Sequence, residues 1–319
     1  MCDPGVFGAL LALFCASSVF AQGRAVAITV DDLPDAGSEL GAPTSRPDVV
    51  NDRLLAAFRI HHVPVTGFVI QQRAQSFGSN LGIGILKKWI SQGFDLGNHT
   101  YSHSDFNDLS PEQMEQEIVR GEPTLRLLMK EAGKKLEFFR FPMNHTGDTK
   151  GKHDVIAVFL SQHGYRLATC TIDTSDYLFT NAYVQMLAKN DEVAAERLRR
   201  EYLAYTSSEI DYYAALNRQV LGYEPPEVML LHDNRLNADV MDQVLRIFEE
   251  KQYRFVSLEA AQSDTAYRTP DTYITKYGMM WGYRWAKERN IKVNGSLEPE
   301  PPKWILEYGK TDGEHSVAR

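Results

Sequence analysis

The sequence predicts an α/β protein whose parallel strands form a barrel-like sheet. Short apolar runs alternate with helical patterns along most of the 319 residues, and this alternation is typical of βα repeats. The apolar runs are nearly continuous, as expected of parallel strands that are covered on both faces. The unusual polar residues follow the apolar runs, and barrels gather their chemistry at the C-terminal ends of their strands. The number of repeats is closer to a barrel than to an open sheet.

The predicted strands and helices alternate from residue 24 to residue 261. The strands are expected at 24–30, 65–70, 94–103, 135–142, 165–173, 227–233 and 253–261. The strand in 94–103 runs into a polar turn, and the one in 253–261 runs into a helix. The helices are expected at 46–63, 83–93, 110–133, 153–164 and 238–252. Ser110, Pro111 and Gln113 form a capping-box start for one helix, and Gly93 supplies the C′ glycine of another.

The first 21 residues are mostly apolar and contain no Lys or Arg. Their apolar run, residues 6–14, is too short to span a bilayer, and Val19, Phe20 and Ala21 form a small-residue cleavage pattern. We therefore expect a secretory signal peptide over 1–21, cut before Gln22, and a periplasmic or secreted protein. An N-terminal membrane anchor is the alternative. No later stretch is long and apolar enough for a membrane span, so no integral membrane segment is expected after signal removal.

Composition narrows the class of protein further. Lys and Arg number 34 and Asp and Glu number 42, so nothing resembles a nucleic-acid-binding face. Cys2 and Cys15 leave with the signal, and only Cys170 remains, which allows no intramolecular disulfide. An exported protein without disulfides suits a bacterial envelope and must rely on its core.

Two carboxylates and two histidines stand out at strand ends. Asp31 and Asp32 are adjacent, although like charges repel and their desolvation is costly; a solvated turn is the simpler interpretation. His99 and His103 are four residues apart, and on a helical turn this spacing puts both imidazoles on one face. A catalytic zinc site needs a third protein ligand and an open position. Either aspartate can supply that ligand, and the other then suits a general base.

Five ordered motifs point to one family. "TVDD", "NHTYSH", "RFP", "DTSDY" and "LLHD" resemble the motifs of the polysaccharide deacetylases, carbohydrate esterase family 4, across residues 24–262. The resemblance implies a distorted (β/α) barrel with a helical insertion before the last motif. It also implies metal-dependent removal of an acetyl group from an N-acetylated sugar. The implied domains are a catalytic domain over 22–265, with its insertion at 177–222, and a C-terminal extension over 266–319.

The resemblance also implies roles for the residues around the metal. Asp31 resembles the catalytic base of the family. Asp32, His99 and His103 resemble its metal ligands. Arg140 resembles the arginine that pairs with the base and sets its charge.

Further roles follow for the acid and for the acetyl pocket. His232 resembles the general acid that protonates the leaving amine, and Asp176 the carboxylate that orients and charges it. Tyr177 and Leu230 resemble the apolar residues around the acetyl methyl. The backbone N–H of Met143 takes the place of the oxyanion donor, since the family uses the main chain there.

The chain also departs from the family pattern. The family usually has Phe where Val30 stands, Gly where Leu33 stands, an aromatic residue where Met143 stands and Trp where Tyr177 stands. The segment 177–231 between the last two motifs is longer than the family leads us to expect. Within it, Ala194, Leu198 and Tyr202 lie on one helical stripe, which predicts either a packed insertion or a lid over the substrate groove.

We expect an exported, metal-dependent hydrolase that removes N-acetyl groups from amino-sugar poly- or oligosaccharides of the peptidoglycan or chitin kind. Zinc is the default for an Asp-His-His site, and Co²⁺ and Ni²⁺ also suit imidazole ligands. Two alternatives stay open: a hydrolase of the same fold acting on another C–N bond or an O-acetyl ester, and a silent carbohydrate-binding protein of the envelope. The glycan, the native metal and the oligomeric state are not encoded in these motifs.

Overall fold

The computed structural model describes residues 23–37 and 46–310. The predicted signal peptide, residues 1–21, lies outside this described part. Among the helices of the described ranges, none is long and apolar enough to cross a membrane.

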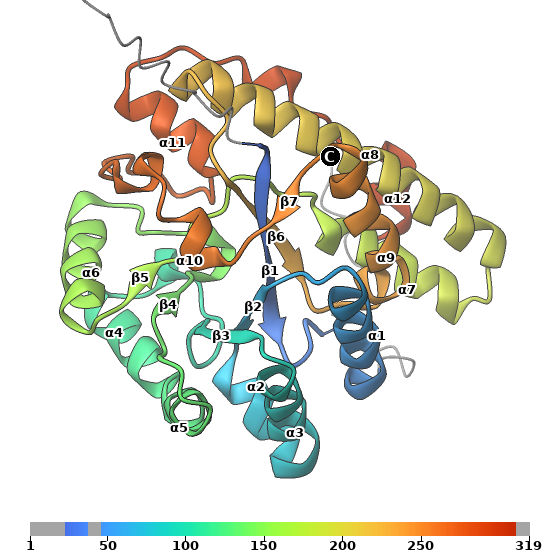
Figure 1. Ribbon diagram of the computed structural model, residues 1–319, viewed down its shortest axis with the longest axis horizontal. Coiled ribbons are helices and arrows are strands. Elements are labelled where there is room, and N and C mark those ends of the chain that lie inside the picture. Colours follow the sequence, from blue (N-terminus) through green and yellow to red (C-terminus); the bar gives the residue numbers. More distant parts are fainter. Residues whose placement is uncertain (1–22, 38–45, 311–319) are drawn as a thin grey trace, which may run out of the picture.

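The strands of the described part form one curled parallel sheet (Figure 1). Its strands run in the order β5-β4-β3-β2-β1-β6, and β7 pairs with the beginning of β1. Ile172, in the chain that leaves β5, bridges to Met229 of β6 and so brings that chain back toward the far side of the sheet. The strands are β1 (Ala25–Leu33), β2 (Val65–Val69), β3 (Asp95–Asn98), β4 (Phe138–Phe139), β5 (Arg166–Leu167), β6 (Glu227–His232) and β7 (Arg254–Phe255). The prediction of an α/β fold with a distorted barrel is confirmed.

The helices lie around the outside of this sheet (Figure 1). They are α1 (Pro47–Ile60), α2 (Gln71–Ser76), α3 (Gly78–Ser91), α4 (Pro111–Arg120), α5 (Pro123–Glu131), α6 (Lys150–Gln162), α7 (Asp176–Ala188), α8 (Glu192–Leu221), α9 (Arg235–Glu250), α10 (Leu258–Ala261), α11 (Trp281–Glu288) and α12 (Lys303–Tyr308). Short 3₁₀ turns are η1 (Phe106–Asp108), η2 (Pro142–Asn144), η3 (Thr265–Arg268) and η4 (Gly295–Leu297).

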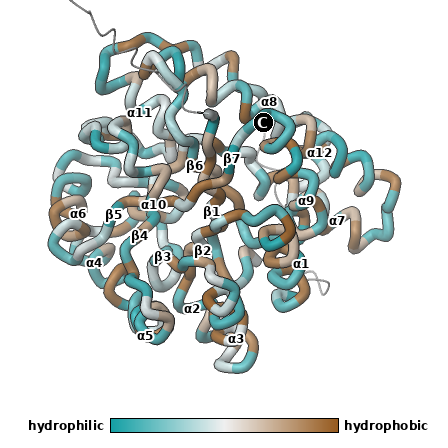
Figure 2. Tube along the Cα trace, viewed as in Figure 1, coloured by the Kyte–Doolittle hydropathy of each residue, from teal (hydrophilic) through white to brown (hydrophobic). Residues whose placement is uncertain are grey.

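Burial on both faces explains why residues 25–30 of β1 are apolar at nearly every position instead of alternating with polar residues. All nine residues of β1 are buried, because the sheet is covered on both sides. Figure 2 shows hydrophobic residues concentrated along the central strands, while the outer helices alternate between hydrophobic and hydrophilic turns. This is the amphipathic pattern of helices that pack on a sheet.

The structure corrects the length of several predicted elements. The helix expected over 110–133 is two helices, α4 and α5, because Pro123 has no N–H to continue the hydrogen-bond ladder. The capping box at Ser110 is present, with Ser110 Oγ accepting from the backbone N–H of Gln113. The strands expected over 135–142 and 165–173 shrink to two residues each. Their remaining residues form the loops that carry polar side chains.

The segment before the last motif folds as α7 and α8, and α8 packs against the body of the protein. Leu198 and Tyr202 of the predicted stripe are fully buried, and Tyr202 Oη donates to Asn237 Oδ1 on α9 at 3.0 Å. Helix α11 of the C-terminal extension lies against α8, with Trp285 buried. This geometry favours the packed insertion over the lid.

We expect Leu198→Ala to lower the free energy of unfolding by about 2–5 kcal/mol, because a buried leucine is replaced by a cavity. The measurement is urea unfolding followed by circular dichroism. Val193→Ala, on the same helix but 84% exposed, is the control and should change stability by no more than about 0.5 kcal/mol. Equal unfolding midpoints for the two variants would show that α8 is not packed as described.

Candidate active site

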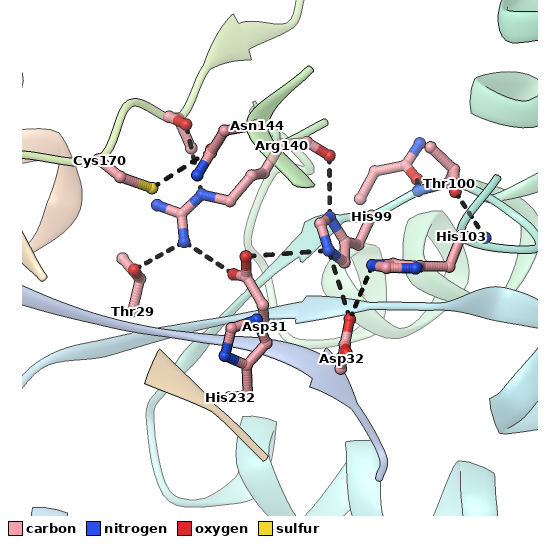
Figure 3. A network of polar contacts seen from close by, with 12 residues as sticks. Thr29, Asp31, Asp32, His99, Thr100, His103, Arg140, Asn144, Cys170 and His232 are labelled. Atoms are coloured by element: carbon pink, nitrogen blue, oxygen red, sulfur yellow. Dashed lines mark hydrogen bonds and ion pairs between the residues drawn. The ribbon is translucent and has the colours of Figure 1, made fainter. Parts of the chain in front are cut away.

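The sequence-predicted residues meet at the C-terminal edge of the sheet. Asp31 and Asp32 lie near the end of β1, and His99 directly follows β3. Arg140 follows β4, and His232 is the last residue of β6, paired in register with Asp31. The five side chains come from the ends of four strands and meet in one region (Figure 3).

The backbone of β1 explains how two adjacent carboxylates reach the same cavity. Neighbouring residues of a regular strand point to opposite faces. Here the register with β2 shifts between Val30 and Leu33, and Asp32 adopts a left-handed backbone with φ of 70°. Asp is one of the residue types that tolerate this conformation. The irregularity lets both Asp31 and Asp32 line one cavity.

The two histidines lie in the turn that follows β3, as expected of a strand that runs into a polar turn, but this turn is not helical. Residues 99–103 form a loop in which Thr100 and His103 have φ of 68° and 63°. Thr100 Oγ1 accepts a hydrogen bond from the backbone N–H of His103 at 3.0 Å and closes the turn. The two imidazole rings are 5.0 Å apart between centroids. A tight turn with two left-handed residues thus brings together what a helical face was expected to align.

Asp32, His99 and His103 form a set that fits a metal ion. Their ligand atoms all lie within 4.8 Å of one another, and the Nε2 atoms of His99 and His103 are 3.4 and 3.3 Å from Asp32 Oδ1. Asp32 Oδ1 is buried, and it has no hydrogen-bond donor among the residues described. His99 Nδ1 faces the carbonyl oxygen of Arg140 at 2.9 Å. Because a carbonyl only accepts, Nδ1 carries the proton and Nε2 offers its lone pair to the set.

The protonation states also suit a cation. Burial lowers the pKa of His103 to about 4, against the pull of Asp32, so the imidazole is neutral at pH 7. Burial works against the charge of Asp32, but the neighbouring His99, His103 and His232 together outweigh it and hold the pKa of this carboxyl well below its usual range. The set therefore offers one carboxylate, the neutral imidazole of His103 and the Nε2 of His99, which are ligand types that suit a divalent cation.

Asp31 is held by a fully buried arginine. Arg140 Nη1 donates to Asp31 Oδ1 and to Thr29 Oγ1, each at 2.7 Å. The guanidinium also donates to the carbonyl oxygens of Ala168 and Thr169, so its orientation is fixed. The other carboxylate oxygen, Asp31 Oδ2, is 3.8 Å from His99 Nε2. Asp31 thus keeps one oxygen on the arginine and turns the other toward the metal set (Figure 3).

His232 is held by a buried carboxylate on α7. Its Nδ1 lies 2.6 Å from Asp176 Oδ1, and its backbone N–H donates to Asp176 Oδ2 at 2.8 Å. Asn234 and Asn237 donate to the same Oδ2. Burial disfavours the imidazolium, but the Asp176 carboxylate outweighs it and raises the pKa of His232 to about 10. The imidazole is therefore charged at neutral pH, with Nε2 as its other proton-bearing atom.

A cavity of about 630 Å³ joins these groups. The predicted acetyl-pocket residues line it, with Tyr177 and Met143 about half exposed and Leu230 buried. The ring of Tyr177 stands edge-on to that of His232, 6.1 Å away. The volume is in the range of small-molecule sites.

Several cavity residues were not predicted. Arg73 of α2 lies 3.7 Å from Asp32 Oδ2 and donates to the carbonyl oxygen of Asp35. Asn234 and Asn237 donate hydrogen bonds to Asp176. The stretch "DNRLN" directly after "LLH" could have predicted a helix start there, because Asn234 is the N-cap of α9. Gly278 and Met280 line the cavity from the C-terminal extension, and no local motif marks them.

Comparison with known proteins supports the family. Residues 20–168 match the family model described as polysaccharide deacetylase. A peptidoglycan-N-acetylglucosamine deacetylase from Bacillus cereus is 24% identical over 152 residues, which are 48% of this chain and 46% of that protein. The chain thus spans about half the length of the curated relative that it matches.

Solved structures support the fold. A CE4 family pseudoenzyme from Bacillus anthracis is similar over 76% of this chain and 66% of its own, with a TM-score of 0.52 and 14% identity. A mutant of a CE4 family pseudoenzyme, described as having restored enzymatic activity, is similar over 76% of this chain and 68% of its own, with the same TM-score and 16% identity. The sequence match and the fold match confirm the resemblance to the polysaccharide deacetylase family. Because a pseudoenzyme shares this fold, activity has to be argued from the residues of this chain.

Proposed function

We propose that the protein is an exported, metal-dependent deacetylase of acetylated amino sugars in poly- or oligosaccharides. One observation carries the proposal: a paired carboxylate, Asp31 with Arg140, and a charged imidazole, His232 with Asp176, lie in the cavity that holds Asp32, His99 and His103. Amide hydrolysis needs a base for the water and an acid for the leaving nitrogen. Both are present beside a site that fits a Lewis acid.

Asp32, His99 and His103 would hold the divalent metal, with Zn²⁺ favoured and Co²⁺ or Ni²⁺ compatible with the same ligands. When bound, such an ion polarises the amide carbonyl and lowers the pKa of water. The fixed tautomer of His99 keeps the ligand nitrogen available without a rearrangement.

The remaining steps belong to the side chains of this chain. Asp31 accepts a proton from the attacking water through Oδ2, while Arg140 keeps Oδ1 occupied. The new C–O bond forms at the acetyl carbon, and the backbone N–H of Met143 donates to the developing oxyanion. His232 gives its Nε2 proton to the nitrogen as the C–N bond breaks, and acetate and a free amine result. Leu230 and Tyr177 exclude water around the methyl group.

The experiment is acetate release from a panel of N-acetylated glycans, O-acetylated xylan and a cyclic amide, with metal analysis of the same sample. Acetate from the amino-sugar substrates that stops on chelation and returns with zinc supports the proposal. Release only from the ester or opening only of the cyclic amide would favour the same-fold alternative. Glycan binding without any turnover would favour a silent binding protein.

Export remains part of the proposal. The mature protein should be recovered outside the cytoplasm and should begin at or near Gln22, because the apolar run 6–14 and the cleavage pattern after it suit a signal peptidase. N-terminal sequencing of the native protein checks this. Soluble cytoplasmic protein that still begins with Met1 would contradict it.

A further inference from the structure

The loop that carries the oxyanion donor has an unusual backbone. Met143 and Asn144 are consecutive non-glycine residues with φ of 52° and 55°. Side-chain-bearing residues rarely adopt this conformation, so the surroundings have to impose it. The N–H groups of Asn144 and His145 donate to Phe141 O and Pro142 O within the loop, each at 3.1 Å. No described residue accepts from the N–H of Met143, which suits its proposed role.

A buried arginine of the C-terminal extension contacts this loop. Arg284 on α11 is 2% exposed, and its Nη2 donates to the carbonyl oxygen of Asn144 at 3.4 Å. Its Nη1 donates to Thr146 Oγ1 at 3.1 Å and to Asp271 Oδ2 at 2.7 Å. The Asp271 carboxylate neutralises the buried guanidinium, and the fork of Arg284 joins the extension to Asn144 and Thr146, at the C-terminal end of the left-handed turn.

The backbone of Gly278 lies very close to the same loop, on the side that faces the cavity. A Cβ at this position would lie 1.9 Å from the carbonyl oxygen of Met143, a distance that real side chains do not tolerate. Gly278 also lines the cavity, together with Met280. Position 278 therefore has to be glycine, because its backbone lies too close to that of Met143 to leave room for a side chain.

Further hydrogen bonds tie the extension to the site. The N–H of Trp281 donates to the carbonyl oxygen of Cys170 at 2.8 Å, and Cys170 Sγ in turn lies 3.5 Å from Asn144 Oδ1 (Figure 3). On the other side, Asn107 Nδ2 lies 2.9 Å from the carbonyl oxygen of Lys276 and 2.9 Å from His145 Nδ1. The loop is thus held on two sides by residues 276–284.

We propose that the segment 271–284 is part of the active site, with Arg284 and Gly278 as positioning residues that hold Met143 and Asn144 in the left-handed conformation and so aim the Met143 N–H at the substrate carbonyl. The segment lies beyond the match to the family model, which ends at residue 168. The catalytic consequence rests on the proposed function. The conformational consequence does not, and this allows the two to be tested separately.

The test compares Gly278→Ala with Gly295→Ala in the full chain. Gly295 lies in the same extension, and a Cβ there would meet nothing nearer than Tyr283 Oη at 3.4 Å. For each variant we would measure hydrogen–deuterium exchange of the peptide covering 141–147, bound zinc, thermal midpoint, kcat and KM. In Gly278→Ala we expect at least tenfold faster exchange at Asn144 and His145 and at least a tenfold lower kcat. Zinc content and KM should stay within twofold of the parent, and Gly295→Ala should match the parent throughout.

Arg284→Lys provides the second arm and keeps the proposal testable if Gly278→Ala fails to fold. Lysine retains a charge for Asp271 but loses the two-sided fork, so exchange of 141–147 should rise and kcat should fall without a change in zinc content. Arg284→Ala should show still faster exchange of 141–147 and a still lower kcat, so that the lysine variant is a partial rescue.

The outcomes separate the two proposals. Unchanged exchange and unchanged kcat in the folded variants would overturn the positioning role. Equal losses of kcat and zinc would also overturn it, because they would indicate general damage to the site. If the parent protein releases no acetate, the proposed function fails, while the exchange measurement still decides whether 271–284 holds the loop.

Discussion

Asp31→Asn should keep its full metal content and lose about 10²–10⁴-fold of its turnover, the usual contribution of a positioned base. An asparagine oxygen still accepts the hydrogen bond from Arg140 Nη1, so the buried pair keeps its geometry. The amide cannot take a proton from water at neutral pH. Because Asp31 is not among the three groups whose ligand atoms converge, metal affinity should be retained.

Asp32→Asn should fail in the opposite way. Asp32 supplies the only negative charge of the Asp32, His99 and His103 set, and its Oδ1 faces both imidazoles. The variant should lose bound zinc, and excess zinc should restore part of its activity. Metal analysis and turnover of both purified variants provide the measurement, with Asp52→Asn, an exposed carboxylate paired with Lys88, as the control.

The pattern of failure is the test. A metal-free Asp31→Asn beside a fully loaded Asp32→Asn would mean that the two roles are reversed. Full activity in both variants would remove metal-assisted hydrolysis as the function of this cavity.

The fold was predictable from the sequence because burial controls it. The sheet is covered on both faces, so apolar runs such as 24–30 and 227–233 mark β1 and β6 closely. Lengths were less predictable where polar loops follow short strands. Phe138–Phe139 and Arg166–Leu167 are only two residues each, because the pairing ends there and following residues such as Arg140 turn into the site.

The chemistry of the site was predictable for a different reason. Asp31, Asp32, His99, His103 and His232 are polar residues at the ends of apolar runs, and the parallel sheet necessarily brings those ends together. The local geometry was not predictable. The turn at 99–103 depends on the hydrogen bond between His103 N–H and Thr100 Oγ1, and the sequence spacing alone suggested a helix instead.

The cavity wall from the C-terminal extension left no signal in the sequence. Arg284 and Asn144 are 140 positions apart, and the contact depends on how α11 packs against α8. Trp281 and Trp285 are buried, so the aromatic stretch around them packs the extension onto the rest of the protein. The contacts that this segment makes with the loop around Met143 can be seen only in the tertiary structure.

Asp176→Asn should lower turnover and move the alkaline limb of the pH–rate profile downward. Burial alone would lower the pKa of His232, and the charge and hydrogen bond of Asp176 reverse this and raise it to about 10. The acid form of His232 is therefore present below that pH and is lost as the pH rises through it. An amide in place of the carboxylate removes the charge that outweighs burial, so the proton leaves at a lower pH.

The comparison with Asp173→Asn isolates the effect of the hydrogen bond between Asp176 and His232. Asp173 belongs to the same motif and lines the same cavity, but its carboxylate accepts from the backbone N–H of Ser175, whereas Asp176 contacts His232 Nδ1. A bound cation shifts the limb of every variant in the same direction, so the difference from the parent is the quantity to measure. We expect a clear downward shift for Asp176→Asn and a smaller one for Asp173→Asn, with equal zinc contents. An alkaline limb that stays in place in Asp176→Asn would show that this carboxylate does not charge the acid, and His232 would then need another source for its proton.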